Sequence, residues 1–219
     1  MESWFTDILV LLQDNRTELW EGLVVTLQLW AASGVAGLVL ALGLALGATQ
    51  GGPAVRRLVR VYSAALRGTP LLVQMFLLYY GLSQFEWVRA SASWEVLEDA
   101  FYCGLIALTL NIAAYMAEDI RAGILAVPPG QQEAARAFGM PTGTLLRRIV
   151  LPQALRIATP ALGNELVSLL KATALVSTIT VFDLTGVARR LSTESYTTDA
   201  LVLAGLVYGV WTWRMRAGG

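Results

Sequence analysis

One long uncharged stretch most constrains how this chain can fold. No Asp, Glu, Lys or Arg occurs between Glu21 and Arg56, and most of this stretch, Leu23 to Ala48, is apolar. A helix needs about 20 predominantly apolar residues to cross the hydrocarbon core of a bilayer. The whole chain is 56% hydrophobic, whereas soluble domains have roughly 45–50% apolar residues. The sequence therefore predicts a helical protein that crosses a membrane several times.

Further hydrophobic stretches extend this prediction to one transmembrane domain over residues 1–219. We expect an all-α membrane protein with five transmembrane helices, at about residues 22–49, 61–85, 100–126, 155–182 and 197–213. Residues 1–21 are expected to form an interfacial segment, because apolar side chains recur on one side of a helix over its first part. These side chains are Trp4, Phe5, Ile8, Leu9 and Leu12.

The distribution of arginine predicts the orientation. Loops on the cytoplasmic side of a membrane protein carry an excess of Lys and Arg. One set of connections holds Arg56, Arg57, Arg60, Arg136, Arg147, Arg148, Arg156, Arg214 and Arg216. The opposite side has fewer arginines among many acidic residues. We therefore expect the N-terminus outside, the C-terminus inside, and the loop at 127–153 in the cytoplasm.

Composition also argues against several classes of function. The net charge is zero, so no global basic field favours nucleic acid. The chain has no His, the residue most used as a general base and metal ligand. Its single lysine, Lys171, is not in a Walker A loop. We expect no catalytic residue, metal or cofactor in this chain.

The loop at 127–153 contains several helix breakers. Pro128-Pro129-Gly130 is expected to end one helix, residues 131–138 to form a short second helix, and residues 142–149 a third. Glu133 is placed in the first turn of the short helix, where the helix dipole favours a carboxylate. Two small residues, Ala134 and Ala135, leave this helix thin enough for another protein to approach closely.

The spacing in this loop resembles the signature loop of the membrane subunits of bacterial ABC importers. The matching residues are Glu133, Ala134, Ala135, Gly139, Ile149, Leu151 and Pro152. In that family the loop is a coupling helix that fits into a groove on a separate ATP-binding subunit. The resemblance implies that the ATPase is contacted by Glu133, Ala134, Ala135, Phe138 and Gly139.

Other stretches resemble, more narrowly, the polar amino-acid uptake branch of histidine, glutamine and arginine permeases. They are Arg67–Gln74, Leu110-Asn111, Ala114–Glu118, Leu151–Arg156, Gly163-Asn164-Glu165 and Ser168–Lys171. The resemblance implies a multi-pass permease subunit in the bacterial inner membrane. Its implied partners are a second permease, which is a copy or a paralogue, two ATPase subunits that hold ATP and Mg, and an extracytoplasmic solute-binding protein.

Polar residues within the predicted spans are candidates for a substrate pathway. An ionisable side chain at membrane depth is costly, by at least about 2.5 kcal/mol, and usually faces protein or a watery cavity. Glu165 can hold the ammonium group or a cationic side chain of an amino acid. The expected lining residues are Thr69, Gln74, Asn111, Asn164, Glu165 and Ser168. A structural role remains open, with Glu165 bonded to a neighbouring helix.

Two other functions stay open at this point. One is an ABC importer permease for another small solute, and the other is a membrane scaffold subunit that does not transport. Near the cytoplasmic end of the third predicted span, we expect Glu118, Asp119 and Arg121 to form a salt-bridged cluster.

Overall fold

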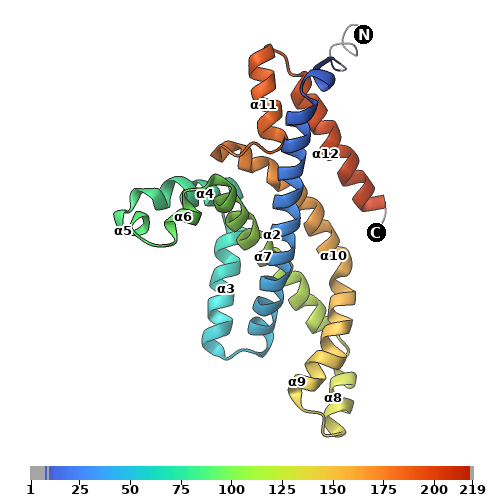
Figure 1. Ribbon diagram of the computed structural model, residues 1–219. Coiled ribbons are helices and arrows are strands. Elements are labelled where there is room, and N and C mark those ends of the chain that lie inside the picture. Colours follow the sequence, from blue (N-terminus) through green and yellow to red (C-terminus); the bar gives the residue numbers. More distant parts are fainter. Residues whose placement is uncertain (1–7, 9, 218–219) are drawn as a thin grey trace. The chain divides into compact units, whose positions relative to one another are not determined.

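The computed structural model describes residues 8 and 10–217, and every regular element in this part of the chain is a helix (Figure 1). Of the interfacial segment predicted at 1–21, residues 1–7 and 9 lie outside the described residues, residues 10–14 are helical, and residues 16–21 belong to α2. The helices are α2 (Arg16–Gln50), α3 (Pro53–Gly68), α4 (Leu71–Phe76), η1 (Leu77–Gly81), η2 (Leu82–Gln84), α5 (Glu86–Arg89), α6 (Trp94–Leu97), α7 (Ala100–Ala126), α8 (Pro129–Ala137), α9 (Thr142–Leu145), η3 (Leu146–Val150), α10 (Leu151–Ala172), η4 (Thr173–Ile179), α11 (Leu184–Ser195) and α12 (Asp199–Ala217).

Two described helices, α2 and α7, are each long and apolar enough to cross a membrane. Two broken helix pairs raise this number to four if each pair counts as one span: α3 with the helices from Leu71 to Gln84, and the helices from Thr142 to Ile179 with α11. The chain divides into two compact units. One contains residues 1–34, 70–109 and 166–219, and the other contains residues 35–69 and 110–165.

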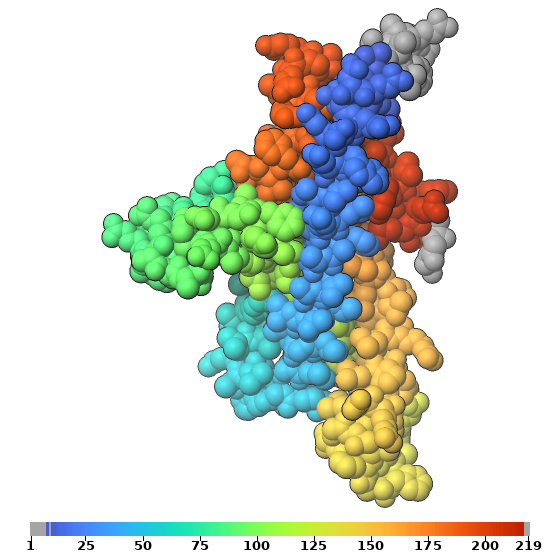
Figure 2. Space-filling view, in the orientation of Figure 1, coloured from blue at the N-terminus to red at the C-terminus, as the bar shows by residue number. Residues whose placement is uncertain are grey.

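In the first unit, α11 packs against α12 and against the N-terminal part of α2. Figure 2 shows orange α11 beside the blue start of α2. A buried apolar cluster joins these helices, because each contributes a face of small and aliphatic side chains. Its buried members are Leu19, Leu184, Val187, Ala188, Leu191, Ala200 and Ala204.

In the second unit, glycines allow close helix approaches. A Cβ on Gly47 would lie 3.2 Å from Val55 of α3, and a Cβ on Gly123 of α7 would lie 2.4 Å from the carbonyl oxygen of Ala154 in α10. Real Cβ atoms do not come that close to a backbone oxygen, so only glycine fits at position 123. Small residues at helix contacts are typical of membrane proteins, where they let backbones pack closely.

The stretch predicted as a span at 61–85 is not one continuous helix. Helix α3 ends at Gly68, and Thr69 is extended, with φ −118° and ψ 146°. The reason is local, because a proline disfavours the helical conformation of the residue before it, and Pro70 follows Thr69. The helix starts again at Leu71.

The last two predicted spans also differ from the observed helices. The region predicted at 155–182 contains most of α10 and the 3-10 helix η4, and Thr180 then leaves the helix with a positive φ of 69°. Helix α12 runs from Asp199 to Ala217, four residues beyond the predicted end at residue 213.

Candidate functional site

The signature loop forms a short helix, α8, that begins earlier than predicted. Pro129 is its first residue, a position that suits proline because the first N–H groups of a helix have no partner within it. Glu133 therefore lies beyond the first turn, which contains no acidic residue. The predicted place of Glu133 in the first turn, where the helix dipole would favour it, is therefore wrong.

The small side chains of α8 divide between its two faces. Ala135 is buried, whereas Glu133 and Ala134 are exposed. Phe138, at the end of the helix, is 91% exposed. An apolar side chain this exposed is available to a partner protein. Thus the outer face of α8 presents Glu133, Ala134 and Phe138, and Ala135 holds the helix to its own subunit.

Gly139 ends α8 in the left-handed conformation, with φ 75°. Its N–H donates to the carbonyl of Arg136, and the N–H of Met140 donates to that of Ala135, at 2.9 and 3.1 Å. Glycine is the residue that adopts this conformation with least strain and so ends many helices. The glycine of the signature spacing is thus explained by the backbone turn after α8.

A side-chain amide connects α8 to the helix that follows the loop. The Nε2 of Gln153 in α10 donates to Oε1 of Gln131 in α8 at 2.6 Å, and to the carbonyl of Ile149 at 2.9 Å. Hence α8 is joined to the start of α10 by a direct hydrogen bond.

The broken end of α3 is stabilised by side chains from α7. The carbonyl of Leu66 would normally accept from the N–H four residues later, but Pro70 has none. The Nδ2 of Asn111 donates to this carbonyl at 3.1 Å, and Tyr115 Oη donates to the carbonyl of Arg67 at 3.5 Å. Asn111 therefore stabilises the end of α3, and its predicted place in the substrate pathway remains a prediction.

Glu165 lies on α10, half-buried, in the unit that also contains α3 and the second half of α7. It interacts electrostatically with Asp119 of α7 and with Arg67 of α3. The Arg67 guanidinium lies over the ring of Tyr115, 5.3 Å from its centre. The electrostatic neighbours of Glu165 thus include one like charge, on Asp119, and one opposite charge, on Arg67.

Asp119 was not predicted as a site residue. The expected ion pair of its cluster is present, since Arg121 bonds Glu118 at 2.9 Å. Asp119 does not join it, and within the described residues its buried Oδ2 accepts no hydrogen bond. A buried carboxylate oxygen without a donor is costly. The position of Asp119 within a predicted span was the sequence signal that could have identified it as a site residue.

The other predicted pathway residues have varied settings. Thr69 donates from its hydroxyl to the carbonyl of Ala65 at 2.7 Å and is exposed, as is Asn164. In the other unit, Gln74 of α4 is buried and Ser168 of α10 is exposed. The second unit therefore contains Thr69, Asn111, Asn164 and Glu165, and the first contains Gln74 and Ser168.

A buried carboxylate at the start of α11 was also missed. Asp183 is 0% exposed. Its Oδ1 accepts from the N–H of Gly186 at 2.9 Å, and its Oδ2 accepts from Tyr208 Oη of α12 at 3.2 Å. Asp183 was not predicted from the sequence as a site or structural residue. Its position just before a helix is the signal for an N-cap that could have identified it.

Comparisons with known proteins agree with the helical architecture. The family described as "Binding-protein-dependent transport system inner membrane component" matches residues 35–212. The octopine transport system permease protein OccM of Rhizobium radiobacter is 48% identical over 87% of this chain and 78% of its own length. The histidine/lysine/arginine/ornithine transport system permease protein HisM of Escherichia coli K12 is 41% identical over 80% and 74%.

Solved structures give the same result. A crystal structure of an amino acid ABC transporter with histidines has a TM-score of 0.83 and 35% identity, over 95% of this chain and 94% of that chain. An inward-facing methionine transporter, MetNI, shares the fold at 18% identity, with a TM-score of 0.79. On these grounds, the chain belongs to the family of inner membrane components of binding-protein-dependent transport systems.

Proposed function

We propose that this chain is the permease subunit of an ABC importer that moves a polar, cationic amino acid from the outside into the cytoplasm. The observation that carries the proposal is that relatives aligned over most of the chain are named for transport of octopine, of arginine, or of histidine, lysine, arginine and ornithine. The charge around Glu165 supports the cationic preference, because Glu165 and Asp119 together outweigh Arg67.

In this proposal the chain crosses the membrane five times, with its N-terminus outside and its C-terminus in the cytoplasm. Support comes from two groups of arginines: Arg56, Arg57 and Arg60 in the first half of α3, and Arg147, Arg148 and Arg156 after α8. The helix α12 ends in Arg214 and Arg216, as expected for a helix that finishes at the cytoplasmic surface.

The chain works with partners and hydrolyses no ATP itself. A second permease subunit, a copy or a paralogue, completes the pathway, and an extracytoplasmic binding protein delivers the substrate. Two separate subunits hold ATP and Mg. Their closure moves α8, and the Gln153–Gln131 bond passes this movement to α10, which contains Glu165. The importer thereby acts as a two-state system biased by a distant ligand.

Uptake measurements test which class of amino acid is transported. The complex with its co-encoded ATPase and binding protein is reconstituted in liposomes, and uptake of arginine, histidine, glutamine and glutamate is compared. We expect cationic substrates to be preferred and Glu165→Gln to lower their uptake about tenfold or more, because a paired charge at low dielectric is lost. The control is Glu86→Gln on exposed α5.

Each result bears on a different part of the proposal. Preference for neutral or acidic amino acids would overturn the cationic assignment and retain the importer. Uptake unchanged in Glu165→Gln would give Glu165 a structural role. No uptake of any amino acid by the wild-type complex would favour another solute or a scaffold.

Ala134 and Ala135 of α8 provide a separate test of coupling. Ala134→Asp adds a charge on the exposed face, and we expect at least tenfold less transport-stimulated ATPase activity, because an unpaired charge is placed in a protein contact. Ala135→Asp buries the charge within the subunit itself and is expected to lower the amount of folded permease. If Ala134→Asp hydrolyses ATP and transports normally, α8 is not the contact.

A further inference from the structure

A groove in the first unit is not explained by transport. It lies among α2, α11 and α12 and has a volume of about 200 Å³. Its lining is apolar except for one arginine, and consists of Leu12, Arg16, Leu19, Trp20, Leu23, Leu184, Leu203 and Val207. We propose that this groove binds one acyl chain of a glycerophospholipid whose phosphate contacts Arg16.

The charged and apolar parts of the groove follow one another along α2. Arg16 is the first residue of this helix. A helix rises 1.5 Å per residue, so Leu23 lies roughly 10 Å further along the axis. Leu203 and Val207 of α12 line the same groove. A molecule that fits must therefore have an anionic end and an apolar tail, which is the chemistry of a phospholipid.

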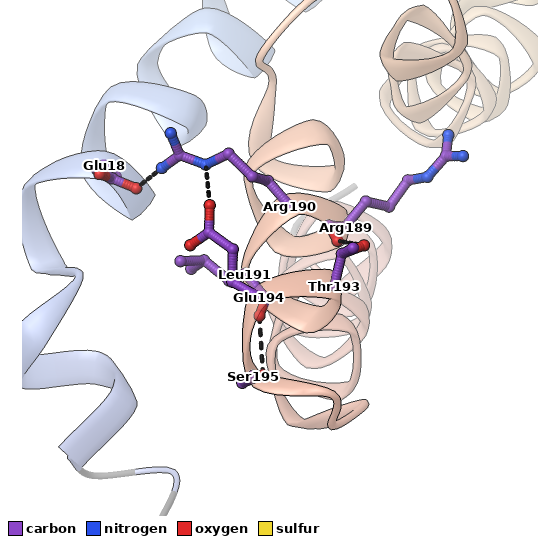
Figure 3. Close-up of polar contacts among 7 residues, drawn as sticks. All are labelled: Glu18, Arg189, Arg190, Leu191, Thr193, Glu194 and Ser195. Carbon is purple, nitrogen blue, oxygen red and sulfur yellow. Dashed lines mark hydrogen bonds and ion pairs between the residues drawn. The ribbon is translucent and has the colours of Figure 1, made fainter.

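The charge of Arg16 is available for such a headgroup. The neighbouring acid on α2, Glu18, is bonded to Arg190 of α11, and Arg190 Nε also lies 3.8 Å from Glu194 (Figure 3). Among the described residues, no ion pair includes Arg16.

The position and size of the groove favour a lipid over a protein. Trp20 is 64% exposed at its rim, and exposed tryptophans are enriched where a membrane meets water. α2 is one of the two helices apolar enough to span the bilayer alone. A helix with its side chains is about 10 Å wide, and a groove of about 200 Å³ holds part of a single acyl chain more readily than a helix.

Photo-crosslinking of the whole complex tests this proposal. The complex is reconstituted in vesicles with trace amounts of a probe lipid that has a photoreactive acyl chain, and labelled residues are mapped by mass spectrometry. Phosphatidylglycerol and phosphatidylcholine probes both have the phosphate, and diacylglycerol does not. We expect labelling at residues 12–23 and 203–207 to be about fivefold weaker with diacylglycerol, because one basic residue near an anionic lipid contributes a factor of roughly that size.

Matched variants separate the groove from general lipid contact. Leu203→Trp fills the groove, and Leu206→Trp alters an exposed residue of the same helix that does not line it. We expect only the former to reduce labelling. Arg16→Gln should lower phospholipid labelling to the diacylglycerol level, and Arg89→Gln, exposed on α5, should not.

Clear results would overturn the proposal. They are equal labelling by all three probes, equal effects of Leu203→Trp and Leu206→Trp, or crosslinks that show a protein segment in the groove. Arg16 is exposed, so Arg16→Gln leaves the packing intact and decides the question even if Leu203→Trp fails to assemble. None of these measurements depends on the substrate proposed above.

Discussion

Two carboxylates of this permease, Asp183 and Glu165, differ in their burial and in their polar neighbours. Asp183 is fully buried, caps α11 through Gly186, and accepts a hydrogen bond from Tyr208. Glu165 is only half-buried, and its electrostatic neighbours include another acid, Asp119. A buried polar group with all its bonds made stabilises a fold, whereas a partly accessible acid beside a like charge is available to a ligand.

The bonds around Asp183 extend to three helices. Tyr208 of α12 also accepts from Thr185 Oγ1 at 3.2 Å. The N–H of Leu184 donates to Thr26 Oγ1 of α2 at 3.0 Å. In this network, α2 and α12 are both fixed to the start of α11. Among the described residues, Glu165 has no hydrogen-bond network of this kind.

The largest expected effect is on stability, from Asp183→Ala. The change removes the N-cap of α11 and the acceptor for Tyr208, so we expect the free energy of unfolding to fall by about 2–4 kcal/mol. Thermal unfolding of the purified complex in detergent measures this. Glu95→Ala on exposed α6 is the control. If the two variants unfold alike, Asp183 does not stabilise the fold.

A smaller loss is expected from Tyr208→Phe. The ring remains, but the hydroxyl that donates to Asp183 is removed, so the free energy of unfolding should fall by about 1–2 kcal/mol. The same unfolding experiment applies, and the double variant with Asp183→Ala should lose less than the sum of the two single changes. Full additivity would show that the two side chains act independently.

The smallest stability effect is expected from Asp119→Asn. Because this change removes one of two neighbouring like charges, the free energy of unfolding should stay within about 0.5 kcal/mol or rise. The KM for uptake of cationic amino acids should rise several-fold. A strongly destabilised Asp119→Asn protein with normal uptake would make Asp119 structural and remove the contrast with Asp183.

The membrane-spanning character and the signature loop were predictable because both are local properties of the chain. Uncharged length predicts α2, and the signature spacing identifies a loop whose glycine ends α8. Pro70 is the sequence signal for the break after α3, but this break was not predicted. The side chain that stabilises the broken end, Asn111, comes from a helix distant in the sequence. The start of α8 was misjudged by two residues, because Pro129 begins a helix here.

The sequence by itself determined the class of protein, its apolar helices and the loop expected to meet the ATPase, because these depend on composition and on spacing within one segment. Only the tertiary structure decided which carboxylates are satisfied and which are not. Asp183 accepts a hydrogen bond from Tyr208 on another helix. The electrostatic neighbours of Glu165, Asp119 and Arg67, also lie on other helices. Hydrogen bonds and charges act through space, so residues distant in the chain set the environment of each acid.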